Sequence, residues 1–279
     1  MKPETVDAIH ATTLKARELL MTEISEQLEG IYGLLPSGQF KPAAEYPVLG
    51  SIPEAAETRR RLEVLLADER QAGLTAQQAH EKLSKEAAFT WLNRLVAFKM
   101  METRRLLRQT VTRRQDSNGF LMWLTEAGNE EHRHDYEAGD LPQDGFGEGP
   151  RQRAYRRFLL AQCVRLAQEV RVLFDPDNLA SRLCPRPQTL RQLIDWLNGE
   201  QLQDAWQPGN EETIGWVYQA FNAEDLEQAF REVRVAKKKF EASDIPSVTQ
   251  LFTPRWIVRF LVENTLGRMW VGCRSHIDV

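Results

Sequence analysis

Apolar residues recur at intervals of three and four along most of this 279-residue chain, which is the spacing of one face of an α-helix. The first three series span Pro3–Gly30, Pro53–Arg70 and Thr75–Leu107. Later series cover Arg151–Phe174, Leu190–Leu197, Ile214–Phe221 and Glu224–Phe240. Strand patterns are scarce, so the sequence predicts a mainly α fold of many helices.

Two stretches interrupt this pattern. The segment Gln39–Ser51 contains several prolines and glycines and predicts a loop. Helical spacing is also absent between Arg113 and Pro150. Within that stretch, the short apolar run Phe120–Leu124 predicts a strand, and the acidic, glycine-bearing segment after it predicts a flexible loop over about residues 126–150.

Length and composition narrow the class of protein. A chain of 279 residues is long enough for about two domains. Hydrophobic residues make up 42% of the chain and charged residues 27%, and the mean hydropathy is -0.48, values typical of globular proteins. No apolar run approaches the roughly 18 residues of a membrane span, and the first residues lack the apolar core of a signal peptide. We therefore expect a cytoplasmic protein without a membrane partner.

Cysteine usage and net charge exclude two further classes. The chain has 3 cysteines without Cys-x-x-Cys spacing, which indicates neither a disulfide framework nor a zinc ribbon. The net charge is -4, so the chain as a whole is not a polycation that holds nucleic acid by bulk attraction. Any contact with DNA must come from a local group of basic residues.

The last apolar series is preceded by Thr253 and Pro254, a pair typical of helix starts. With Thr253 at the N-cap and Pro254 in the first helical position, the remaining free backbone N–H groups could receive a small anion such as a carboxylate. The alternative is that Thr253 only caps its helix. The spacing alone does not decide between the two.

Three blocks of sequence resemble a known family. The run Gln250–Arg268, which contains Leu251-Phe252-Thr253-Pro254-Arg255-Trp256, is similar to motif X, the opening motif of DNA adenine-N6 methyltransferases. The blocks Ile214–Asn222 and Phe89–Glu102 resemble the N-terminal region of PglX, the large methyltransferase of bacteriophage exclusion (BREX) systems. Together these blocks span nearly the whole chain.

This resemblance implies a phage-defence protein that transfers a methyl group from S-adenosylmethionine to adenine in DNA. It implies a helical N-terminal domain over residues 1–242 and the start of an incomplete α/β methyltransferase domain over residues 243–279. Because Phe252, Thr253 and Pro254 match motif X, the resemblance implies that these three residues contact the cofactor. DNA would be the substrate of the full-length enzyme, and other BREX proteins are expected as partners.

The chain also departs from the family pattern. No glycine-bearing cofactor loop follows the motif X run, and no Asn/Asp-Pro-Pro-Tyr/Phe catalytic motif occurs. The Asp175-Pro176 pair lacks the second proline and the aromatic residue that would stack on a flipped adenine. We therefore expect that these residues alone bind the cofactor weakly and do not methylate. We also expect Trp256, Phe260 and Trp270 to expose an apolar patch that promotes self-association.

Other candidate sites are less specific. A polar segment containing two histidines could be drawn as a metal cluster, but a solvated loop is the favoured interpretation (Glu131, His132, His134 and Asp135). Gly145, Gly147 and Gly149 lack the following Lys-Ser/Thr of a phosphate loop and predict a flexible linker. Within the basic clusters, the candidate DNA-binding residues are Arg153, Arg157, Lys237 and Lys238, with a solvated surface as the alternative.

The sequence leaves a second function open. A helical module that binds another protein or DNA, without any catalytic role, would carry the same helices and the same basic clusters. It would not bind S-adenosylmethionine.

Overall fold

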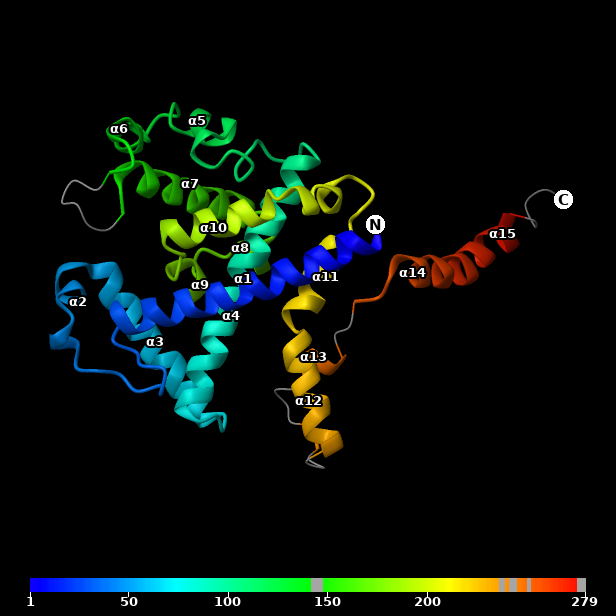
Figure 1. Ribbon diagram of the computed structural model, residues 1–279, viewed down its shortest axis with the longest axis horizontal. Helices are drawn as coiled ribbons and strands as arrows, with labels where there is room; N and C mark the ends of the chain where they lie inside the picture. The colour runs from blue at the N-terminus through cyan, green and yellow to red at the C-terminus, as the bar shows by residue number, and fades with distance from the viewer. Residues whose placement is uncertain (142–147, 236–238, 241–244, 250–251, 275–279) are drawn as a thin grey trace. The chain divides into compact units, whose positions relative to one another are not determined.

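The computed structural model describes residues 1–141, 148–235, 239–240, 245–249 and 252–274. The chain divides into two compact units, Met1–Gly209 and Asn210–Val279 (Figure 1). The described residues are largely helical and contain no strand, with one isolated bridge between Leu34 and Phe40. The predicted mainly α fold is confirmed. Among the described residues, no helix has the length and apolar character needed to cross a bilayer.

The first unit is built around two long helices, α1 (Pro3–Gly30) and α4 (Ala76–Thr103). Its other α-helices are α2 (Pro47–Ser51), α3 (Pro53–Gln71), α5 (Asn118–Trp123), α6 (Glu130–Ala138), α7 (Pro150–Leu166), α8 (Arg171–Phe174), α9 (Leu179–Arg182) and α10 (Pro187–Leu197). Its single-turn 3-10 helices are η1 (Ala43–Glu45), η2 (Arg114–Asp116), η3 (Glu200–Leu202) and η4 (Asp204–Trp206).

Helix α4 begins where the sequence predicts. Thr75 is its N-cap: the Gln78 N–H donates to Thr75 Oγ1 at 3.2 Å, and the Thr75 N–H donates to Gln78 Oε1 at 2.9 Å. This reciprocal capping box satisfies two N–H groups that a helix start leaves without partners. The helix ends at Thr103, four residues before the predicted Leu107, because Arg105 takes a φ of 59° that no α-helix continues.

Helices α1 and α4 pack against each other and form the centre of the core (Figure 1). Trp91 of α4 is fully buried, and its indole N–H donates to the carbonyl of Ala180 at 2.6 Å. Phe98, two turns further on, is also fully buried and lies 5.5 Å from the ring of Phe174. The block Phe89–Glu102, which resembles PglX, therefore forms the largely buried C-terminal half of a core helix.

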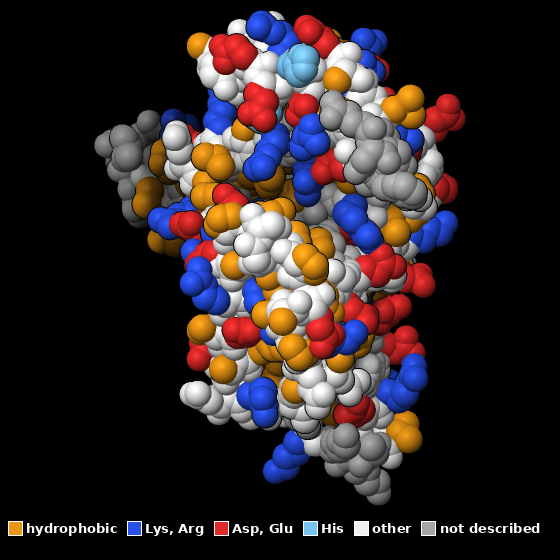
Figure 2. Space-filling model, turned by 90° about the vertical axis from the view of Figure 1, so that its left-hand side faces the viewer, with side chains coloured by type: hydrophobic (Ala, Val, Ile, Leu, Met, Phe, Trp, Pro, Cys, Tyr) orange, Lys and Arg blue, Asp and Glu red, His pale blue; other side chains and the backbone are white. Residues whose placement is uncertain are grey.

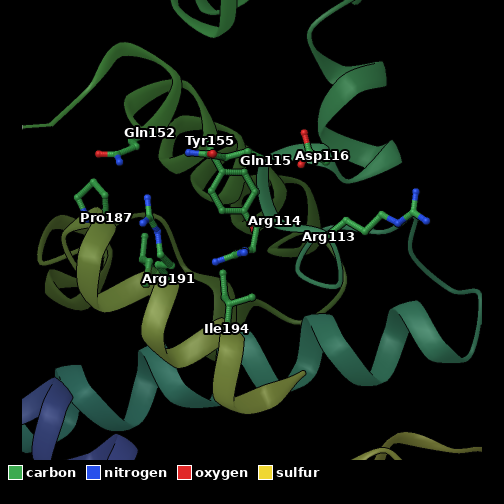
Figure 3. A pocket seen from close by; sticks show the side chains of 10 residues that line it. Arg113, Arg114, Gln115, Asp116, Gln152, Tyr155, Pro187, Arg191 and Ile194 are labelled. Carbon is green, nitrogen blue, oxygen red and sulfur yellow. The ribbon is translucent and has the colours of Figure 1, made fainter. Parts of the chain in front are cut away.

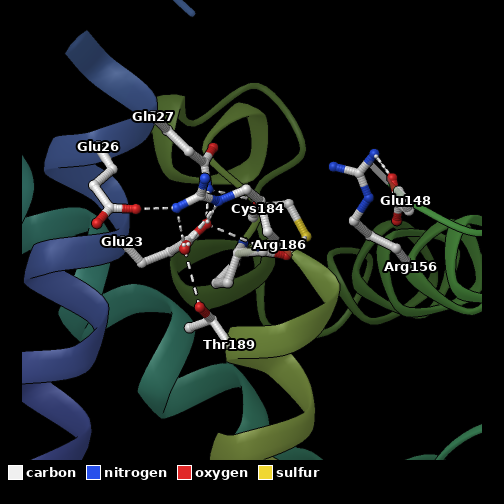
Figure 4. Close-up of polar contacts among 9 residues, drawn as sticks. Glu23, Glu26, Gln27, Glu148, Arg156, Cys184, Arg186 and Thr189 are labelled. Atoms are coloured by element: carbon white, nitrogen blue, oxygen red, sulfur yellow. Dashed lines mark hydrogen bonds and ion pairs between the residues drawn. The ribbon is translucent and has the colours of Figure 1, made fainter. Parts of the chain in front are cut away.

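A buried carboxylate joins α1 to α10. Glu23 accepts hydrogen bonds from Arg186 Nε at 2.8 Å, from the Arg186 backbone N–H at 2.9 Å and from Thr189 Oγ1 at 2.9 Å (Figure 4). Gln27 Nε2 donates to the same carboxylate at 2.7 Å. Burial opposes ionisation of Glu23, but the hydrogen bonds from Arg186, Gln27 and Thr189 together outweigh it and lower the pKa of this carboxyl below its ordinary value of 4.5.

The predicted strand at Phe120–Leu124 is wrong, because this segment forms helix α5. Helical spacing places Phe120 and Trp123 on one face, where they pack with Phe158 of α7 at ring-centroid distances of 5.3 and 5.6 Å. A short apolar run does not distinguish a buried helix from a strand, and here the aromatic partners on α7 decide the outcome.

Two predicted loops also contain helices. Helix α6 lies within the loop predicted for residues 126–150, and α2 lies within the loop predicted at Gln39–Ser51. Helix α6 is stabilised by contacts that its polar sequence does not reveal: His132 stacks on Trp123 at 5.0 Å, and Asp135 forms an ion pair with Arg153. Gly145 and Gly147 lie outside the described residues.

The second unit carries the segment that resembles motif X. Its helices are α11 (Thr213–Phe221), α12 (Ala223–Val235), α13 (Ile245–Thr249), α14 (Arg255–Val262) and α15 (Arg268–Arg274), with a π-helical turn at Glu263–Gly267 that joins the last two. The unit starts at Asn210, so the domain predicted over residues 1–242 extends past the end of the first compact unit.

Candidate functional site

The residues before α14 are held against α11 by an aromatic contact. The ring of Phe252 lies 5.4 Å from that of Trp216, with 60° between the ring planes. A Cβ atom at Gly215 would stand 2.0 Å from Cδ2 of Phe252. Only glycine at position 215 leaves room for this ring, so the contact depends on a particular residue in each segment.

Helix α14 starts one residue later than predicted. It begins at Arg255, and Pro254 is its N-cap, with a ψ of 143° and no side-chain capping bond. Because Pro254 stays extended, its own carbonyl accepts the first helical hydrogen bonds, from the N–H groups of Ile257 at 3.0 Å and Val258 at 3.3 Å. The placement of Thr253 at the N-cap and of Pro254 in the first helical position is therefore wrong.

A carboxylate already stands at the start of α14. The Arg255 N–H donates to Oε2 of Glu212 at 3.4 Å, and Glu212 is the residue that precedes α11. A helix N-terminus favours negative charge. Glu212 therefore links α11 to α14 at the position where sequence reasoning expects a small anion.

The structure brings together two of the three blocks that resemble PglX. Gly215 and Trp216 come from the block Ile214–Asn222, and Phe252 comes from the motif X run. The third block lies in α4 of the first unit. Sequence reasoning did not single out Gly215 as a contact residue, although an isolated glycine inside a helical series signals a close approach.

The predicted cofactor residues, Phe252, Thr253 and Pro254, lie next to one another directly before α14. Phe252 and Pro254 are partly buried, whereas Thr253 is exposed. Phe252 packs on α11, so part of its ring is committed to positioning the segment. Contact of these three residues with S-adenosylmethionine stays a prediction.

Helices α14 and α15 expose their apolar side chains. The indole of Trp256 is 71% exposed, and Phe260, Leu266 and Trp270 are exposed to a similar extent. Such side chains are usually buried against a partner, and contiguous apolar patches mark interaction surfaces. The predicted exposure of Trp256, Phe260 and Trp270 is confirmed. Self-association through them stays a prediction, which sedimentation at high concentration tests.

One of the candidate DNA-binding residues has an internal partner. Arg153 forms two hydrogen bonds to Asp135, at 2.7 and 3.1 Å, which join α7 to α6. Arg157, one turn further along α7, is exposed and lines, together with Arg153 and Asp135, a hollow on the surface. Lys237 and Lys238 lie outside the described residues. Binding of DNA by any of them stays a prediction.

His132 and His134, for which the sequence favours a solvated loop over a metal cluster, lie in helix α6. The ring of His132 stacks on that of Trp123 at a centroid distance of 5.0 Å. Within the described ranges, His, Cys, Asp and Glu side chains form no group of three that could hold a metal ion.

Charge is mixed over the surface that Figure 2 displays. Acidic and basic side chains intersperse on this face, without a continuous field of either sign. On this face, attraction of a polyanion would depend on individual clusters of arginines.

Comparison with known proteins agrees with the resemblance seen in the sequence. The chain is 30% identical over 289 aligned residues to the adenine-specific methyltransferase PglX of Lacticaseibacillus casei (strain Zhang), an alignment that covers 95% of this chain and 23% of the relative. It is 30% identical over 246 residues to the adenine-specific methyltransferase BrxX of Escherichia coli O9:H4 (strain HS), covering 82% of this chain and 19% of that relative.

The similarity, which extends over most of this chain, identifies it as an N-terminal region of the PglX type. The chain spans only 23% and 19% of the length of these two curated relatives. No protein-family model matches the chain, and no solved structure matches it.

Proposed function

We propose that this chain is the N-terminal part of an S-adenosylmethionine-dependent DNA adenine-N6 methyltransferase of a BREX phage-defence system. The observation that carries the proposal is 30% identity to an adenine-specific methyltransferase over 95% of the chain. The packing of Phe252 on Gly215 supports it, because this contact joins two of the segments that resemble the family.

In this proposal the two units have different tasks. The first unit is a support with a core of its own. The second unit presents the segment Phe252-Thr253-Pro254 and helix α14 to the catalytic domain, whose cofactor loop and catalytic motif belong to a part of the protein other than these residues. The exposed apolar side chains of α14 and α15 would pack against that domain, which would explain why they have no cover within the second unit.

Methylation by the full reading frame tests this function. The reading frame that encodes these residues is expressed in a host, and N6-methyladenine in the host DNA is measured by mass spectrometry. If Phe252 positions the cofactor segment, Phe252→Ala should lower methylation about tenfold or more, because small displacements of a reacting group are costly. Phe240→Ala is the matched control, since Phe240 lies in the same unit and is exposed.

A different result would contradict the proposal. If the reading frame contains neither a glycine loop nor an Asn-Pro-Pro-Tyr motif, the chain is not part of a methyltransferase. Equal methylation in the Phe252→Ala and wild-type proteins would show that this segment does not position the cofactor.

The second candidate function is a helical module that binds protein or DNA without a catalytic role. The exposed apolar row on α14 and α15 favours it, since such a row also suits a separate partner protein. Calorimetric titration of the purified chain with S-adenosylmethionine separates the two functions. Binding that is lost in Thr253→Ala supports the methyltransferase, whereas no binding, together with salt-sensitive binding of duplex DNA, supports the module.

A further inference from the structure

A small cavity lies in the first unit, away from the segment that resembles motif X. It opens between η2, the start of α7 and α10 and has a volume of about 160 Å³. Its described lining residues are Arg113, Arg114, Gln115, Asp116, Gln152, Tyr155, Pro187, Leu190, Arg191 and Ile194 (Figure 3).

The cavity has an apolar floor and a cationic edge. Leu190, Ile194 and Tyr155 are buried, and the Tyr155 hydroxyl donates to the carbonyl of Thr110 at 2.8 Å, which fixes the ring. In Figure 3 the guanidinium groups of Arg114 and Arg191 face the same space beside Tyr155. Arg113 points away from this space, and Asp116 stands apart from both guanidinium groups.

The two arginines differ in how they are held. Arg114 forms an ion pair with Asp195 at 3.0 Å, in which both side chains are partly exposed. Its φ of 50° is unusual for a residue other than glycine, and such backbone angles are found at ligand-binding sites more often than elsewhere. Arg191 is exposed and has no ion-pair or hydrogen-bonding partner in the part of the chain that the structure describes. Its charge is therefore available to a ligand.

These groups match the chemistry of a phosphate. A guanidinium group presents several N–H donors in a planar fork that suits phosphate oxygens. Pro187, at the edge of the cavity, is the first residue of helix α10, whose N-terminus already meets the Glu23 carboxylate, so the positive charge of the cavity comes from the arginines. Asp195 already pairs with Arg114, so Arg191 contributes the charge that no carboxylate of the described residues neutralises.

The size of the cavity limits what it can hold. Sites for complete drug-sized ligands usually measure about 300–1,000 Å³. The volume of about 160 Å³ is too small for a whole nucleotide or for S-adenosylmethionine, which in addition carries no phosphate. A single phosphate group with the first atoms of its ester suits the space.

We propose that this cavity binds a phosphate group through Arg114 and Arg191. The group would come either from the backbone of DNA or from a free phosphate or small phosphate ester. The proposal stands on the residues of the cavity and does not require that the protein transfers methyl groups.

Two binding measurements test the proposal, each on the purified chain. The first compares thermal unfolding in sodium phosphate with unfolding in sodium chloride at equal ionic strength. The second measures the affinity for a fluorescent DNA duplex at two salt concentrations. The variants are Arg191→Gln and Arg114→Gln. Arg165→Gln is the matched control, because Arg165 is an exposed arginine at the far end of α7.

Phosphate should stabilise the wild-type chain and the Arg165→Gln control more than chloride does, and this extra stabilisation should be lost in both cavity variants. If the phosphate belongs to DNA, Arg191→Gln should also weaken duplex binding about tenfold and reduce the salt slope by about one. If only the phosphate effect is lost and duplex binding is unchanged, the source is a free phosphate or small ester.

The proposal is overturned if phosphate stabilises the wild-type chain no more than chloride does, or if all three variants respond to phosphate as the wild type does. Circular dichroism of each variant verifies that its fold is intact. Neither measurement uses S-adenosylmethionine or methylation, so failure here is distinct from failure of the proposed function.

Discussion

Helix α4 and the α14–α15 segment use similar side chains in opposite environments. Trp91 of α4 is fully buried, whereas Trp256 of α14 is 71% exposed and Trp270 of α15 is 64% exposed. Both segments form helices, as their apolar spacing predicts. What differs is the packing partner: α4 packs on α1 and α3 of its own unit, whereas the apolar row of α14 and α15 is uncovered within the second unit.

This contrast separates two kinds of information in a sequence. The helical spacing of apolar residues determines that a helix forms and which face it would bury. The burial itself depends on another segment, and the energy is gained only when that segment is present. The same substitution should therefore have different effects in the two regions.

The largest difference is expected for the two tryptophans. Trp91→Ala should lower the free energy of unfolding by about 3–5 kcal/mol, because it leaves a cavity in the core and removes the donor to the Ala180 carbonyl. Trp256→Ala should change stability by less than about 0.5 kcal/mol. Urea unfolding of both variants and of the wild type measures these changes in the free energy of unfolding. A large cost for Trp256→Ala would mean that its indole is buried in solution, for instance by self-association, and a dependence on protein concentration would reveal this.

A buried glutamate of the first unit and an exposed glutamate of the second extend the comparison to the pH dependence of stability. Glu23→Gln should cost about 1.5–3 kcal/mol at neutral pH, because it removes the charge that Arg186 and Thr189 bond. The folded-state pKa of Glu23 is lowered, so its contribution is present above the ordinary value of 4.5 and is lost as the pH falls through the folded-state pKa. The stabilities of wild type and variant should therefore converge in acid.

The control for this prediction is Glu263→Gln in the second unit. Glu263 forms an exposed ion pair with Arg259 at 2.6 Å. Solvent screens such a pair, so no measurable change is expected at any pH. If the Glu23→Gln difference did not shrink as the pH is lowered to the acid limit of the folded state, ionisation of Glu23 would not be the source of its contribution.

Two helical glycines test the contact between α11 and Phe252. Alanine forms helices better than glycine by about 1 kcal/mol, so propensity alone predicts that Gly215→Ala and Gly272→Ala both stabilise. At Gly215 the new Cβ would meet the Phe252 ring, and overpacking of this kind costs about 1–3 kcal/mol. At Gly272 the Cβ would meet no atom within 4 Å.

Hydrogen exchange resolved by peptide is the measurement for these glycine variants. Amides of α11 and of the start of α14 should exchange faster in Gly215→Ala, whereas amides of α15 should exchange more slowly in Gly272→Ala. Slower exchange around α11 in Gly215→Ala would show that Phe252 does not occupy this position in solution.

The sequence predicts where helices form better than it predicts which helices pack against each other. The starts of α1, α3 and α4 are read directly from Pro3, Pro53 and Thr75, because proline and capping residues act locally. Helix α5 is missed because Phe120 and Trp123 obtain their partners from α7, more than thirty residues further along the chain. Local periodicity carries no information on such distant contacts.

The candidate sites likewise depend on contacts between residues that are distant in the sequence. The segment Phe252-Thr253-Pro254 is found from its motif, but its contact with Gly215 joins residues that are far apart in the sequence. The cavity that we propose to bind phosphate is lined by Arg114 and Arg191, which are far apart in the sequence and belong to no common motif. Only the packing of η2, α7 and α10 brings these side chains together.

The smallest effect is expected for two threonines that the sequence treats alike. Thr75→Ala should cost about 1 kcal/mol in urea unfolding, because the hydroxyl accepts the Gln78 N–H at the start of α4. Thr253→Ala should change stability by less than about 0.5 kcal/mol, since Pro254 is the N-cap of α14 and Thr253 lies outside the helix. That neutrality makes Thr253→Ala a clean probe of cofactor binding. Equal costs for the two variants would instead mean that Thr253 caps α14 in solution and that its hydroxyl is not free to meet a ligand.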